Sequence, residues 1–94
     1  MRVRWLRKAL RNLDDEANFI AADDEAAARL VVTRVLAAVA QLREQPAVGR
    51  PGRVPGTREL VVLNTHYIVP YRVLSDEIQI LRVFHTSRRP PKSW

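Results

Sequence analysis

Three residues in the second half of this chain are of types that could cleave RNA. Arg58 and Arg82 lie within apolar segments, and His85 ends the later of these segments. Guanidinium groups hold phosphates and stabilise charge that develops on a phosphoryl group, and a histidine can carry a proton near neutral pH. The three residues are therefore a candidate catalytic set, with His85 as general acid or base. Structural roles stay open beside it, because each arginine could pair with the chain's own carboxylates and His85 could simply end a strand.

The same half of the chain is rich in cations that could bind a partner. Residues 48–94 hold eight basic and three acidic side chains, whereas residues 1–47 hold eight and seven. Fourteen of the sixteen cations are arginine, and the net charge is +6. This bias predicts an anionic partner, either nucleic acid or an acidic protein segment, although a basic protein can also lack one. The candidate binding residues are Arg50, Arg53, Arg72, Arg88, Arg89 and Trp94.

Metal, cofactor and membrane chemistry find no support in the sequence. There is no cysteine, and His66 and His85 have no acidic residue at ligand spacing. There is also no glycine-rich phosphate loop and no secretory signal, and the longest uncharged apolar run, residues 35–42, is too short to span a membrane. We therefore expect a cytoplasmic protein that binds no metal, cofactor or membrane, with His66 on its surface.

The apolar pattern predicts one α+β domain over residues 1–94. A short strand over 3–5 precedes two amphipathic helices, over about 6–20 and from Asp23-Asp24 to before Pro46. A loop rich in proline and glycine follows, over 46–56. Three strands, at about 58–63, 66–73 and 77–85, then form an antiparallel meander. The helices are joined so closely that they must form a hairpin.

Several details of the sheet follow from this pattern. Pro70 lies inside the second meander strand and cannot donate a hydrogen bond, so we expect a bulge or an unpaired stretch there. Arg72 and Arg82 should approach each other across the ladder. Tyr67 and Tyr71 share one face of their strand, where they either stack on bases or join the core.

The last strand carries apolar residues on both of its faces. They stand at even and odd positions alike: Ile78, Ile80, Leu81, Val83 and Phe84. Apolar groups therefore point to both faces, and the helical hairpin can cover only one face. We therefore expect a partner to cover the second face. The polar tail over 88–94 either docks on that partner or frays.

Four segments, taken together in their order and spacing, are similar to a known family. They are Val3-Arg4-Trp5 with Ala9-Leu10-Arg11-Asn12-Leu13, then residues 46–60, then Tyr67-Ile68-Val69-Pro70-Tyr71-Arg72-Val73, and last Ile80-Leu81-Arg82-Val83-Phe84-His85. Over essentially its whole length the chain resembles the RelE/ParE superfamily of bacterial type II toxin–antitoxin toxins. The resemblance implies a helical hairpin packed on an antiparallel sheet, and a cognate antitoxin whose C-terminal segment wraps the toxin.

The superfamily divides by activity. ParE-like members inhibit DNA gyrase and serve in plasmid stabilisation, whereas RelE-like members cut mRNA in the ribosomal A site. Lys8 and Lys92 are the only lysines, neither falls where a RelE-type catalytic lysine belongs, and no tyrosine follows the last strand. The resemblance therefore favours a non-enzymatic gyrase inhibitor that meets DNA only through its antitoxin complex. The alternative is a ribosome-dependent endoribonuclease that uses Arg58, Arg82 and His85. A third possibility is a binding module without toxicity.

Overall fold

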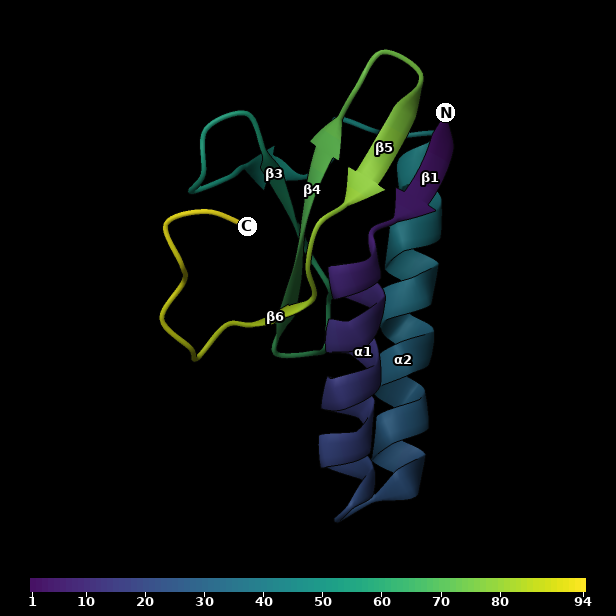
Figure 1. The fold of residues 1–94 in the computed structure, drawn as a ribbon. Helices are drawn as coiled ribbons and strands as arrows, with labels where there is room; N and C mark the ends of the chain where they lie inside the picture. The colour runs from purple at the N-terminus through teal and green to yellow at the C-terminus, as the bar shows by residue number, and fades with distance from the viewer.

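A helical hairpin packs against one face of a β-sheet in this protein (Figure 1). The computed structural model describes all 94 residues. The elements in chain order are β1 (Arg2–Trp5), α1 (Arg7–Ala21), α2 (Glu25–Ala40), the 3₁₀ turn η1 (Gln41–Arg43), β2 (Arg50–Pro51), β3 (Arg58–Val61), β4 (Tyr67–Val73), β5 (Glu77–Ile80) and β6 (Phe84–His85). The predicted α+β architecture is confirmed, with its N-terminal strand, helical hairpin and meander.

A side-chain cap fixes the start of the second helix, and apolar stripes place both helices on the sheet. The Asp24 carboxylate accepts a hydrogen bond from the Ala27 amide at 3.0 Å, which caps the first turn of α2. Ala9 of α1 and Val35 and Val39 of α2 are buried against the sheet, as the apolar stripes predict. Neither helix is long and apolar enough to cross a membrane.

The sheet has the strand order β1-β5-β4-β3-β2, and β6 pairs with β4 beside the end of β5. Strands β3, β4 and β5 form the predicted antiparallel meander. β1 joins the edge of β5 in parallel, with Arg2 opposite Glu77 and Trp5 opposite Ile80. The single strand predicted over residues 77–85 is divided into β5 and β6.

Pro70 explains this division. Tyr71 pairs with Ile80 and Ile68 pairs with Phe84, so three steps along β4 correspond to four steps on the facing strand. The extra residue lies within 81–83, where the Leu81 amide donates to the Pro70 carbonyl at 2.9 Å. The predicted bulge is confirmed, and it arises because proline has no N–H to continue the ladder.

The face of the sheet that packs on the helices carries the main core. Tyr67, Val69 and Tyr71 of β4 point to this side and are at most 5% exposed. Ile78 and Ile80 of β5 join them and are fully buried. Both tyrosines are therefore core residues, and the alternative in which they stack on bases is wrong.

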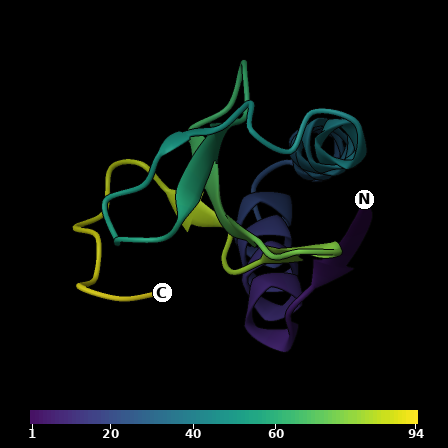
Figure 2. The ribbon, with the colours of Figure 1, turned by 90° about the horizontal axis from the view of Figure 1, so that it is seen from above.

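The second face is covered in part by the chain itself. Figure 2 shows the segment after β6 on the side of the strands opposite the helices. Its last residue, Trp94, packs edge-to-face on Phe84 with ring centroids 5.4 Å apart. The expectation that only a partner could cover this face is corrected, because residues 86–94, which we call the C-terminal strap, return across it.

Candidate functional site

Strand register gathers arginines on the second face of the sheet. Residues paired directly across a ladder project to the same side, so Arg50 lies with Glu59 and Pro70, and Arg72 lies with Gln79 and Arg4. Side-chain contacts add Arg53 to this group. We call the group the basic face; its members are Arg2, Arg4, Arg50, Arg53, Arg72, Glu59, Glu77 and Gln79.

Glu59 organises one end of the basic face. It is 1% exposed, and one carboxylate oxygen accepts from the Arg50 guanidinium at 3.2 Å. The other oxygen accepts from the Arg53 backbone amide at 2.9 Å, and the Arg53 Nε lies 3.6 Å from the first. A buried carboxylate needs such partners, so this cluster fixes the loop between β2 and β3 against β3.

Glu77 organises the other end. Its carboxylate lies 3.0 Å from Arg2 and 3.5 Å from Arg4, and it accepts a hydrogen bond from Gln79 at 2.9 Å. The hydrogen bonds from Gln79 and Arg2 hold the pKa of Glu77 below its usual value. The amide oxygen of Gln79 in turn accepts a hydrogen bond from the Arg72 guanidinium at 2.9 Å. Arg72 therefore bonds a neutral group, and no carboxylate of the chain pairs with it.

The basic face holds more guanidinium groups than carboxylates. Five arginines meet two glutamates, and the four arginines in ion pairs remain 41–72% exposed. Sequence reasoning selected Arg50, Arg53 and Arg72 but missed Arg2 and Arg4. The alternation Arg2-Val3-Arg4-Trp5 was the available signal, since period two places both arginines on one side of a strand.

Arg58 lies on the opposite face and has a structural role. Its guanidinium donates to the carbonyls of Ala47 and Gly49, at 3.2 and 2.8 Å. The Tyr71 hydroxyl donates to the Pro46 carbonyl and accepts from the Gly49 amide, both at 2.8 Å. A Cβ at Gly49 would lie 2.6 Å from the Tyr71 ring, so only glycine permits this approach. Together these bonds fasten the loop after α2 to the sheet.

His85 lies at the other end of β4 in a polar cluster. Its Nδ1 is 2.7 Å from the Ser87 hydroxyl and accepts from the Ser87 amide at 3.2 Å. Its ring packs edge-on against Tyr67 and lies 5.7 Å from the exposed ring of His66, measured between centroids. A cavity of about 400 Å³ opens here, and Phe19 lines it as well. The cluster brings His66 beside His85, which the sequence separation concealed.

Glu16 of α1 joins this cluster to the strap. Arg88 donates to both of its carboxylate oxygens, at 2.9 and 3.0 Å, and the Tyr67 hydroxyl donates at 2.9 Å. Burial raises the pKa of Glu16, but the bonds from Arg88 and Tyr67 outweigh it and leave that pKa below its usual value. Burial and the bond to Glu16 raise the pKa of Tyr67 to about 12. Arg88 therefore anchors the start of the strap.

The three candidate catalytic residues do not meet. Arg58 pairs with Tyr71 and His85 with Tyr67, so they lie at opposite ends of a stretch of β4 that spans roughly 13 Å. Arg82 lies in the bulge and donates to the carbonyl of Leu81; burial lowers the pKa of its guanidinium. Arg72 faces Gln79 in the ladder and bonds it, so Gln79 takes the cross-strand place at which Arg82 was expected.

Trp94 and Arg89 complete the predicted binding residues. Trp94 lines a cavity of about 320 Å³ with Pro55, Arg72 and Leu81. Its indole N–H is buried without a hydrogen-bond partner. Residues 89–94 make no hydrogen bond at all, and Arg89 is exposed without an ion pair. Apolar contact alone therefore holds the end of the strap.

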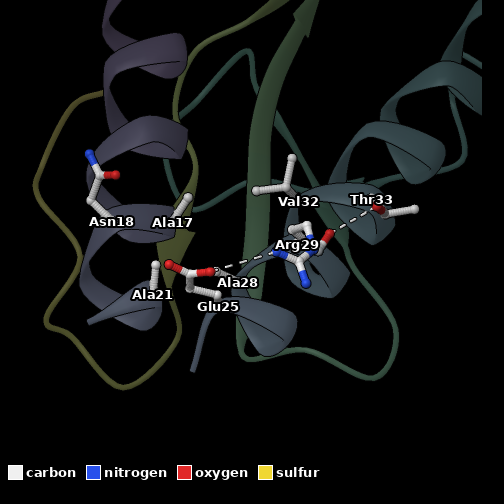
Figure 3. A pocket seen from close by; sticks show the side chains of 8 residues that line it. All are labelled: Ala17, Asn18, Ala21, Glu25, Ala28, Arg29, Val32 and Thr33. Carbon is white, nitrogen blue, oxygen red and sulfur yellow. Dashed lines mark hydrogen bonds and ion pairs between the residues drawn. The ribbon is translucent and has the colours of Figure 1, made fainter. Parts of the chain in front are cut away.

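The helical hairpin offers little chemistry. A cavity of about 430 Å³ between α1 and α2 is lined by small side chains, among them Ala17, Ala21 and Ala28 (Figure 3). Glu25 and Arg29 at its rim are 4.0 Å apart and well exposed. No group of three or more histidine, aspartate or glutamate side chains anywhere in the chain could hold a metal ion.

Comparisons with known proteins agree with one another. A protein-family model described as "ParE toxin of type II toxin-antitoxin system, parDE" matches residues 3–90. A relative from Sinorhizobium fredii named "Putative toxin Y4kP" is 47% identical over 91 residues, which is 97% of this chain and 94% of that protein. A solved structure described as the chromosomal ParDE TA system from P. aeruginosa superposes with a TM-score of 0.81 at 32% identity, over 90% of this chain and 95% of that chain.

Proposed function

This chain belongs to the ParE family, the toxins of type II toxin–antitoxin systems, and from that premise we propose that it inhibits DNA gyrase and is neutralised by a cognate antitoxin. The proposed site of action is the cytoplasm, where the target and the antitoxin are both present. The alternative for this fold is cleavage of mRNA on the ribosome.

The separation of Arg58 from His85 is the observation that favours inhibition over cleavage. A nuclease needs its phosphate-holding groups and its proton carrier around one reacting centre. Arg58 is bound to loop carbonyls at one end of β4, while the Nδ1 of His85 is occupied by Ser87 at the other end. The length of β4 between them leaves no shared position at which both could act on one phosphate.

Neutralisation by an antitoxin is supported by surface that the chain leaves uncovered. Phe19 and Leu63 are 73% and 77% exposed, and Phe19 borders the cavity beside His85. A partner segment with apolar residues would bury both side chains.

The decisive experiment measures supercoiling by purified gyrase with increasing amounts of the purified chain. We expect supercoiling to fall as the chain is added, and to recover when the antitoxin encoded beside it is supplied. In cells, induced expression should cause DNA double-strand breaks and an SOS response. Codon-phased mRNA ends without DNA breaks would instead establish the endoribonuclease, and normal growth would establish a binding module without toxicity.

A His85→Ala variant separates the two mechanisms further. We expect it to remain toxic, because inhibition of gyrase by contact requires no proton carrier. The matched control is His66→Ala, which removes the neighbouring exposed imidazole from the same cavity. Loss of toxicity in His85→Ala alone, in a variant that folds as the wild type does, would overturn gyrase inhibition as the mechanism.

A further inference from the structure

The arrangement of the basic face points to a ligand of its own. Arg4, Gln79 and Arg72 occupy one level across three neighbouring strands. Arg50 lies at the far edge of the sheet on β2, opposite Glu59. From β1 to β2 the sheet crosses four strand spacings, which is about 19 Å. The arginines therefore form a row across the sheet rather than a single point of charge.

The row keeps a net positive charge despite its internal pairs. Five guanidinium groups and two carboxylates leave three net positive charges. Arg2 and Arg4 share Glu77, and Arg50 and Arg53 share Glu59, so each carboxylate orients two arginines while neutralising one. Side chains oriented in this way lose less entropy when they bind an anion.

We propose that the basic face binds the phosphate backbone of duplex DNA directly. One strand of a duplex carries about six phosphates over a length of about 19 Å, so a row of this span can meet several of them at once. This differs from the sequence-based expectation that DNA is met only through the antitoxin complex. It does not depend on gyrase being the target, because the contact is between this chain and DNA alone.

The aromatic side chains favour a duplex over a single strand. Proteins that bind single-stranded nucleic acid stack bases on exposed aromatic rings. Tyr67 and Tyr71 are buried on the other face, and the Phe84 ring is packed against Trp94. The ring beside Arg72, Trp94, is half-buried and packed on Phe84, so the basic face presents mainly guanidinium groups, which suits contact with a backbone independent of sequence.

The test is a salt titration of binding between the purified chain and a labelled duplex, followed by fluorescence anisotropy. With three net charges, the logarithm of the affinity should fall with the logarithm of the salt concentration at a slope of about −3. Arg72→Gln should make the slope shallower by about one unit, to about −2, since Arg72 bonds only the neutral Gln79. Glu77→Gln should make the slope steeper by about one unit, to about −4, because it removes a carboxylate from the row.

Arg29→Gln is the matched control. Arg29 is an exposed arginine on α2, away from the sheet, and its removal changes the net charge as much as Arg72→Gln does. We expect Arg29→Gln to leave the slope unchanged. An equal reduction in both variants would mean general attraction to a basic protein and would overturn the assignment to this face.

Two other ligands are outcomes that would also overturn the proposal. Tighter binding of a single-stranded oligonucleotide of equal length would replace the duplex as the ligand. Tighter binding of a polyglutamate peptide would identify the face as a protein-binding surface. Each variant's melting temperature shows that it is folded. Gyrase inhibition is measured separately, so failure of DNA binding leaves the proposed function intact.

Discussion

The two faces of the sheet are held by different kinds of interaction. The helix-covered face buries a continuous apolar cluster, from Ala9 and Val35 to Tyr71 and Ile80. The opposite face carries charged side chains in shared ion pairs, and beside them a strap whose last six residues make no hydrogen bond. Burial of apolar surface stabilises the first face, whereas on the second face the exposed arginines mainly offset the cost of burying the Glu59 and Glu77 carboxylates.

In this small domain, one face of the sheet provides most of the stability and the other face is available for binding a partner. A chain of 94 residues can build only one main apolar core. Here that core forms between the helices and a single face of the sheet. The other face is free to carry charge and a weakly held segment. Substitutions on each face can measure how large the energetic contrast between them is.

The largest effect is expected from the helix-covered face. Ile80→Ala should lower the free energy of unfolding by about 2–5 kcal/mol, because Ile80 is fully buried and its removal leaves a cavity. Urea denaturation followed by circular dichroism measures this change. A loss below about 1 kcal/mol would show that this core is loosely packed, and the contrast between the faces would disappear.

An intermediate effect is expected where the core meets the strap, at Tyr67. Its folded pKa of about 12 lies above the unfolded value of 10, so the folded state favours the neutral phenol. The resulting stabilisation is fully present below about pH 10 and is lost as the pH rises towards about 12. The loss should be on the order of 2 kcal/mol.

Denaturation at a series of alkaline pH values measures this loss. A Tyr67→Phe variant is the control, and it should lack the portion of the alkaline destabilisation that belongs to this hydroxyl. If the wild type and Tyr67→Phe lose stability in parallel across this range, the bond from Tyr67 to Glu16 does not form in solution.

The smallest effect is expected from the strap. Trp94→Ala removes an aromatic contact worth about 1 kcal/mol, but it also removes a buried N–H that has no partner. The two changes offset each other, so stability should change by less than about 1 kcal/mol. Limited proteolysis should nevertheless cut this variant faster within residues 89–94. A loss as large as that of Ile80→Ala would show that the second face is part of the core.

The local pattern of the sequence predicted most of the fold. The apolar stripes placed both helices, Asp24 was among the predicted caps, and the strand propensities placed the meander. Pro70 predicted the bulge that divides β5 from β6. Each of these features depends on residues close together in the chain, whose preferences act before any long-range contact forms.

The candidate site was predicted less completely. Arg50, Arg53 and Arg72 were selected on charge alone, while Arg2 and Arg4 were missed because their partner, Glu77, lies more than seventy residues away. Arg58 was grouped with His85, although the register places them at opposite ends of β4. Charge can be counted from a sequence, but the face on which a charge lies depends on strand pairing.

By itself the sequence determined both helices, the strands of the meander, their order, the surplus of arginine and the resemblance to ParE-like toxins. Only the tertiary structure decided that β1 joins β5 in parallel, that the carboxylate of Glu59 is buried between two arginines, and that Trp94 returns to Phe84. The physical reason is that local preferences act through neighbouring residues. Register across strands and the return of a tail are instead fixed by the packing of surfaces distant in the chain.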